Sequence, residues 1–140
     1  MRSNRGFGYA IDYVKAIAEA QRVVDYYARP ELDVLAPVAA TLPAYHHNAV
    51  DILIVAPHLA STLGLSADDL RAIYFTCDLP GERYTAAGLS DPLPEDFRRG
   101  EAIIKRLDLE HTPDPVTLQE RRRKAKADLA RYKRNQAKHG

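Results

Sequence analysis

The chain has 140 residues, of which 46% are hydrophobic, and a formal net charge of +1. This length suffices for one hydrophobic core, so we expect a single domain over residues 1–140. No apolar run is long enough to cross a bilayer, and the N-terminal stretch lacks the apolar segment of a secretion signal. The single cysteine excludes an internal disulfide and favours a reducing, cytoplasmic setting without membrane attachment.

Charge is unevenly distributed along the chain. From Gln119 to the end, nine Lys and Arg residues stand against two acidic residues, which gives +7, and the remainder of the chain carries −6. A basic segment of this kind can bind nucleic acid, phosphate, an acidic partner or the acidic part of its own chain. We therefore treat residues 119–140 as a basic C-terminal helix.

The first half of the chain shows helical periodicity. Residues 9–28 predict a helix that ends before Pro30, and a short helix is expected over 32–42, interrupted by Pro37. The next helix is expected over 45–64, where Pro57 should kink or split it and Gly64 should end it. The apolar stripe of the first helix consists of Val14, Ile17, Val24 and Tyr27.

The second half continues in the same way. Ser66 with Asp69 predicts a capping box at the start of "LSADDLRAIYF", and a loop rich in Gly and Pro is expected after it. A further helix is expected over 95–107, with Pro94 near its first turn, and a long charged helix after "HTPDPVT". Alternating strand patterns are nearly absent, so the predicted fold class is all-α, a compact helical bundle.

A few side chains have the chemistry of metal ligands. Imidazole, thiolate and carboxylate groups contributed by three helices suit a divalent ion in a bundle core. The residues alone leave a second interpretation open, because a His at a helix start often caps the helix and a lone Cys often packs as a small apolar side chain. The candidate ligands are His46, His47, Cys77, Asp78 and Asp128.

The order of these features resembles a known family. The stretch "HHNAVDILIVAPHLASTLGLSADDLRAIYFTCDLPGERYTAAGLSDPLP", followed by "KAKADLARYK", is similar to the core of HD-domain phosphohydrolases, especially the compact 5′-deoxynucleotidase-type and phage-encoded members. The similarity covers about residues 44 to 133, and it rests on order and spacing. The resemblance implies an HD-domain-like helical fold.

The resemblance also implies roles for the candidate ligands. His46 or His47 matches the first ligand histidine, Asp78 matches the HD aspartate, and Asp128 matches the last ligand. Cys77 stands where the family has the histidine of the HD pair. A thiolate there would favour Zn²⁺ over harder ions. The alternative is that Cys77 only packs and that the metal site is degenerate.

If the family's chemistry is retained, the chain is a metal-dependent phosphohydrolase acting on nucleotides or other phosphate-containing small molecules. The implied cofactor is a divalent ion (Zn, Mn or Co) that polarises the phosphate and supplies hydroxide. Glu82 would serve as general acid or base. Candidate phosphate-binding residues are Arg22, Arg83 and Lys124.

A hypothesis from a different class needs no catalysis. A helical binding protein would use residues 119–140 to contact the phosphates of nucleic acid or an acidic partner, with salt-sensitive affinity. Alternatively, the charges of this helix only keep one face solvated, while its apolar side chains dock inward. The sequence has no signal for or against an oligomeric assembly, and whether the chain is an enzyme stays open.

Overall fold

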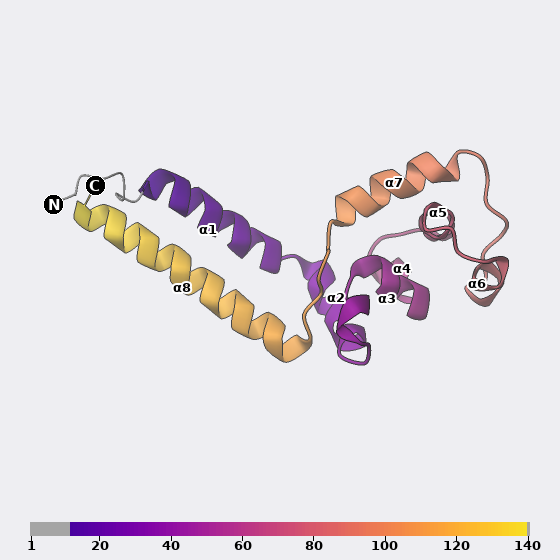
Figure 1. Cartoon of the computed structure of the whole chain (residues 1–140), viewed down its shortest axis with the longest axis horizontal. Coiled ribbons are helices and arrows are strands. Elements are labelled where there is room, and N and C mark those ends of the chain that lie inside the picture. The colour runs from indigo at the N-terminus through magenta and orange to yellow at the C-terminus, as the bar shows by residue number, and fades with distance from the viewer. Residues whose placement is uncertain (1–11, 140) are drawn as a thin grey trace. The chain divides into compact units, whose positions relative to one another are not determined.

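The computed structural model describes residues 12–139, and within them the chain is all-α, with no strand (Figure 1). The predicted fold class is confirmed at this level. None of the described helices is both long and apolar enough to span a membrane. The elements in chain order are α1 (Tyr13–Tyr27), α2 (Pro30–Ala39), the short 3₁₀ helix η1 (Ala44–His46), α3 (Ala49–Val55), α4 (Leu59–Thr62), α5 (Ala67–Thr76), α6 (Gly81–Ala86), α7 (Asp96–Leu107) and α8 (Pro115–His139).

Packing divides the chain into two units. One combines Met1–Arg29 with Val116–Gly140, and the other is Pro30–Pro115. Counted from the sequence, the first unit carries fourteen Lys and Arg against five Asp and Glu, and the second carries six against fourteen. The charge asymmetry seen along the sequence is therefore a difference between packing units, +9 against −8. The division describes packing, so the expected single domain stays a prediction.

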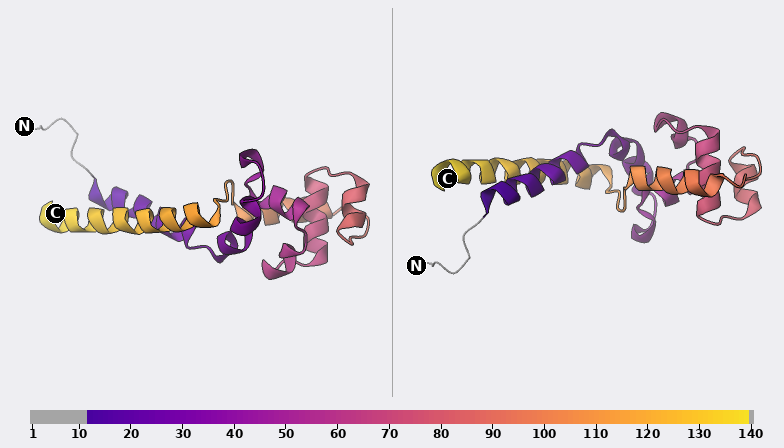
Figure 2. Two further views of the ribbon diagram at one scale, coloured as in Figure 1. Left: turned by 90° about the horizontal axis from the view of Figure 1, so that it is seen from below. Right: turned by 90° about the horizontal axis from the view of Figure 1, so that it is seen from above.

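The described part of the first unit is a hairpin of α1 and α8, which lie side by side (Figure 2). Asp12 starts α1 by accepting a hydrogen bond from the backbone N–H of Lys15 at 3.1 Å. At the other end of α1, the backbone carbonyl of Tyr27 accepts a hydrogen bond from Nε of Arg122 at 2.6 Å. The Arg121 guanidinium lies 6.0 Å from the centre of the Tyr27 ring, within cation–π range. Two basic residues of α8 thus bind α1 through Tyr27.

The inward face of α1 differs from the predicted apolar stripe. Ala20 is the buried residue of α1, whereas Val14, which the stripe includes, is 72% exposed. Ile17, Val24 and Tyr27 are half-buried. Around the axis of α1, Val14 lies about 60° from Ile17. A single partner helix covers only a narrow arc of α1, so Val14 faces solvent. Residues 9–11 of the expected helix lie outside the described residues.

Helix α2 opens the second unit. Helix α1 ends before Pro30, as predicted, and Pro30 is itself the first residue of α2, where a missing N–H costs nothing. The expected interruption at Pro37 is wrong, since the helix continues through it to Ala39. The four buried residues of α2 are Leu32, Leu35, Ala36 and Ala39.

The expected helix over 45–64 is split, as predicted, near Pro57. Asn48 caps α3 by accepting from the backbone N–H of Asp51, and the chain leaves α4 through Gly64, whose φ of +76° suits a glycine. The capping box at Ser66 and Asp69 is confirmed, with both hydrogen bonds present. Capping residues, a proline and a glycine therefore determine where these helices begin and end.

Helix α6 was not predicted, because Pro80 and Gly81 favour a loop. Within it Tyr84 is 5% exposed, and its ring packs edge-on against that of Tyr74, with centres 5.8 Å apart. The Tyr74 hydroxyl donates to the backbone carbonyl of Leu53 at 2.9 Å, which ties α5 to α3. The short helix is thus held by aromatic contact with the core rather than by its own propensity.

Helices α5 and α7 cross at Gly100. A side chain at this position would collide with Oγ1 of Thr76 and with the backbone carbonyl of Ala72, so the crossing requires a glycine. Next to the crossing, Asp96 is fully buried and binds Arg71, with Nε to Oδ2 at 2.9 Å and Nη2 to Oδ1 at 3.3 Å. The core of the second unit therefore contains an ion pair.

Candidate functional site

The two predicted histidines have separate partners within residues 30–115. His46 ends η1, and its Nδ1 lies 3.0 Å from Oδ2 of Asp51, with both side chains partly exposed. The Nε2 of His47 lies 2.7 Å from the backbone carbonyl oxygen of Leu42. Each imidazole thus already uses one ring nitrogen within the protein.

Cys77 and Asp78 follow α5 directly. Cys77 is the C-cap residue and is half-buried, and Asp78 turns the chain with a φ of 54°. Burial raises the pKa of the Cys77 thiol, and the negative charge of Asp51 raises it further. At neutral pH the raised pKa favours the protonated thiol, which is a poor nucleophile and a poor ligand.

Asp128, the last predicted ligand, lies in α8. Its carboxylate accepts from Nζ of Lys124 at 2.9 Å and lies 3.2 Å from Nη1 of Arg131. The hydrogen bond from Lys124 is the main reason that the pKa of Asp128 lies below its ordinary value. Asp128 belongs to the α1–α8 hairpin, whereas the other four candidates belong to residues 30–115.

The described residues contain no cluster of metal-ligating side chains. Among residues 12–139, no three His, Cys, Asp or Glu side chains lie close enough together to hold a metal ion. The one partial convergence is at Asp51, which binds His46 and whose charge acts on Cys77. The ligand set that the resemblance implies therefore has no structural support and stays a prediction.

The predicted catalytic and phosphate-binding residues are also dispersed. Glu82 and Arg83 are exposed on α6. Arg22, on α1, pairs with Glu19 at 2.7 Å, and Lys124 pairs with Asp128. Of these four residues, Lys124 pairs with a predicted metal ligand, Asp128, whose charge it neutralises.

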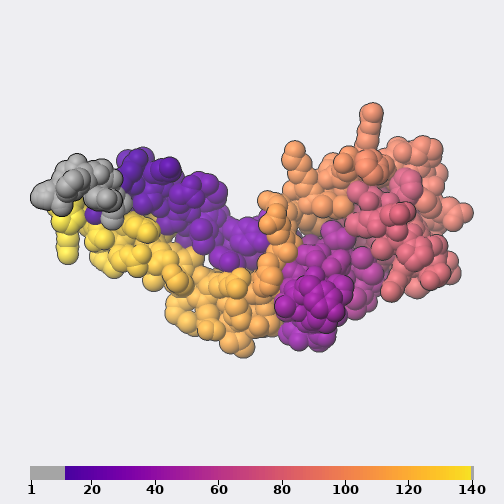
Figure 3. Space-filling view, viewed as in Figure 1, coloured from indigo at the N-terminus to yellow at the C-terminus, as the bar shows by residue number. Residues whose placement is uncertain are grey.

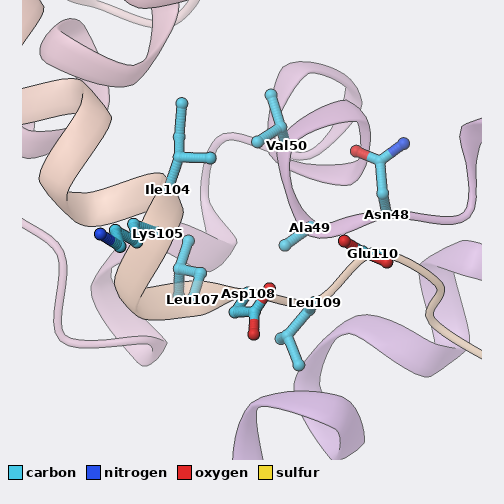
Figure 4. A pocket seen from close by; sticks show the side chains of 9 residues that line it. All are labelled: Asn48, Ala49, Val50, Ile104, Lys105, Leu107, Asp108, Leu109 and Glu110. Atoms are coloured by element: carbon cyan, nitrogen blue, oxygen red, sulfur yellow. The ribbon is translucent and has the colours of Figure 1, made fainter.

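A cavity lies between the start of α3 and the end of α7 (Figure 4). Its volume of about 400 Å³ is large enough for a small ligand. Val50 and Ile104 supply apolar walls, and Asp108 and Glu110 bring carboxylates to the opposite side. None of its lining residues is a His, Cys, Ser or Thr, so the cavity lacks a hydroxyl or thiol nucleophile with a histidine base beside it.

The outer face of α8 gathers exposed positive charge. At about 100° per residue, five exposed Lys and Arg fall within about 140° of the helix circumference, opposite the buried Ala125. In Figure 3 the atoms of α8 lie open along one side. We call this surface the basic face of α8. It consists of Arg123, Lys126, Lys133, Arg134 and Lys138.

Three features separate the basic face from an ordinary charged helix. None of its five side chains has an ion-pair partner among the described residues, whereas Lys124 and Arg131, just outside the arc, share Asp128. The other positions of the arc between 123 and 138 are small and exposed: Ala127, Ala130 and Ala137. No acidic residue lies on the arc in this range. No carboxylate therefore neutralises these positive charges, and no bulky side chain on the arc covers them.

Comparison of the chain with family models, with curated proteins and with solved structures found no match. The HD resemblance therefore rests on the residue pattern alone.

Proposed function

We propose that the chain is a non-catalytic nucleic-acid-binding protein that holds the phosphate backbone of a duplex on the basic face of α8. The observation that carries the proposal is the segregation of charge on this helix. Its paired cations lie toward α1 or beside Asp128, and between residues 123 and 138 its unpaired cations share one arc without an acidic residue. A helix that needed charge only for solubility would gain nothing from gathering unpaired cations on one side over this length.

The chemistry of the face favours a duplex over a single strand. Single-strand binders stack bases on aromatic side chains, and the basic face has none, since Tyr132 lies outside the arc and is half-buried. The face also lacks Asn and Gln, which read adenine edges. Its five cations extend over about 22 Å of helix, at about 1.5 Å per residue, which allows contact with successive phosphates. Binding should therefore be independent of sequence.

The test is the salt dependence of binding to a labelled random-sequence duplex, followed by fluorescence anisotropy. If all five cations contact phosphates, the slope of log K against log salt should approach about −4.5. The triple variant Lys126→Gln, Lys133→Gln, Lys138→Gln should bind more weakly at low salt, with a slope less steep by about 3.

A matched control removes the same charge elsewhere. Arg83→Gln, Arg98→Gln and Lys105→Gln neutralise three exposed cations of residues 30–115. This control should keep the parental slope. Absence of binding at low salt, or an equal loss in the control, would leave the basic face as a solvated surface and end the proposal.

The second candidate is the HD-like phosphohydrolase, and what favours it is that Asp51 binds His46 and that its negative charge also acts on Cys77. Elemental analysis of the purified protein and a phosphatase assay on deoxynucleoside monophosphates test it. Restoring the family's histidine by Cys77→His should raise metal content and activity, and Asp78→Ala should abolish both. Protein that holds no metal after loading with Zn²⁺, Mn²⁺ or Co²⁺, and that shows no turnover, would exclude it.

A further inference from the structure

Two segments of residues 30–115 are joined side by side next to η1. The backbone N–H of Ala49 donates to the carbonyl of Leu109 at 3.2 Å, and the N–H of Thr112 donates to the carbonyl of His47 at 2.7 Å. Thr112 is fully buried, which anchors this segment. The two backbone bonds hold residues 47 and 111 close together, although they are far apart in the sequence.

The protein fixes the tautomer of His47. Its Nε2 lies 2.7 Å from the carbonyl oxygen of Leu42, and because a carbonyl oxygen only accepts, this ring nitrogen must carry the proton. In the neutral imidazole the lone pair then resides on Nδ1. Histidines that bind metals characteristically donate their other ring N–H to a carbonyl or carboxylate in this way, which orients the ring and raises its basicity as a ligand.

His111 supplies a second imidazole beside the first. It is exposed, its ring centre lies 5.6 Å from that of His47, and the two rings are tilted by 53°. Two imidazole nitrogens bound to one ion at about 2.0–2.1 Å, with ring centres about 1.1 Å further out, have centres about 5 Å apart. The observed separation of the ring centres is close to that value, as two imidazoles sharing one ion require.

We propose that His47 and His111 form a binding site for a transition-metal ion of the class that prefers imidazole: Zn²⁺, Cu²⁺ or Ni²⁺. Solvent would complete the coordination, because the described residues bring no third ligand to the pair. The site shares His47 with the ligand set that the HD resemblance implies, but it pairs this residue with His111 and uses neither Cys77 nor the two aspartates. It is also independent of the basic face of α8.

Isothermal titration of the untagged full-length chain with Cu²⁺, and separately with Zn²⁺, tests the site. We expect one ion per chain, and an affinity that falls as the pH is lowered, because protons compete for the imidazole nitrogens. His111→Ala should weaken binding by more than the roughly tenfold typical of losing an outer-shell partner, because a ligand itself is removed. Since His111 is exposed, this variant should fold normally.

Two further variants separate the alternatives. His58→Ala removes another exposed histidine of the same unit and should leave binding unchanged. His46→Ala should also bind normally if His47 and His111 are the ligands. Electron paramagnetic resonance of the Cu²⁺-loaded protein should show two coupled nitrogens, reduced to one in His111→Ala. Absence of binding by the parent chain, or binding that survives His111→Ala, would overturn the proposal.

Discussion

In residues 30–115 a charged pair lies inside the core, whereas in the α1–α8 hairpin the cations lie on the surface or along the rim of the helix contact. The Asp96 carboxylate is fully buried and binds Arg71, whose Nη1 also donates to the Ser90 hydroxyl at 2.9 Å. In the hairpin the buried residues of α1 and α8 are Ala20, Leu118 and Ala125. Residues 30–115 are held together by polar and steric matching, whereas the hairpin is held by a thin apolar contact that leaves its charges on the surface.

The largest effect should come from breaking the buried pair. Asp96→Ala leaves the Arg71 guanidinium buried without its partner, so unfolding should become easier by about 3–5 kcal/mol. Chemical denaturation followed by circular dichroism measures this. Asp68→Ala removes an exposed carboxylate that lies 3.3 Å from the same arginine, and it should cost at most about 1 kcal/mol. Equal losses of stability in the two variants would mean that burial does not determine how much the Arg71–Asp96 pair stabilises the fold.

The helix crossing should be the next most sensitive point. Gly100→Ala places a methyl group against Thr76 and the Ala72 backbone, and separating α5 from α7 should cost about 3 kcal/mol, at the upper end for overpacking. Gly81→Ala is the matched control, because nothing lies within 4 Å of a Cβ at that position. Thermal unfolding should show a clear fall in Tm for the first variant only.

Acid should weaken the same core. Burial alone would raise the pKa of Asp96, but the hydrogen bonds from Arg71 and from the Leu93 N–H outweigh it, so its pKa lies below the ordinary value. A carboxyl group with a lowered folded-state pKa stabilises the fold above about pH 4, and the contribution is lost as the pH falls through that pKa. The free energy of unfolding of Asp96→Asn should therefore vary less with pH below 4 than that of the parent chain. Asp91→Asn, at an exposed position, should keep the parental pH dependence.

The smallest stability effect should come from the basic face. Each of Lys126→Gln, Lys133→Gln and Lys138→Gln removes an exposed charge without a partner, so the free energy of unfolding should change by no more than about 0.5 kcal/mol. Circular dichroism during denaturation measures it alongside the anisotropy titration. A marked loss of stability in these variants would show that the face has a structural role, and the contrast between the two units would fail.

Local signals predicted most of the helices. The capping box at Ser66, the split at Pro57 and the turn at Gly64 follow from a few neighbouring residues each, and all three are present. The predictions failed where tertiary contacts determine whether a helix forms or continues. Helix α6 depends on the packing of Tyr84 against Tyr74, and the continuation of α2 through Pro37 could not be seen in the local pattern.

The candidate sites were harder to predict from the sequence, because they too depend on tertiary contacts. Arg71 and Asp96 are 25 positions apart, and nothing in their neighbourhoods shows that they pair. His111 was not singled out, because its proximity to His47 depends on backbone hydrogen bonds between distant segments. The basic face is the exception. Its charge was visible in residues 119–140, and the periodicity of a helix is enough to place the five cations on one side.

The pairing of the two chain ends in one unit has a consequence for synthesis. Helix α1 leaves the ribosome before residues 30–115, whereas its partner α8 is made after them, and 86 residues separate Arg29 from Val116. At about 5–20 residues per second, α1 waits roughly 4–17 s with its inner side chains uncovered. Residues 30–115 can meanwhile complete their own contacts, so vectorial translation favours an order in which the acidic unit folds before the basic hairpin closes.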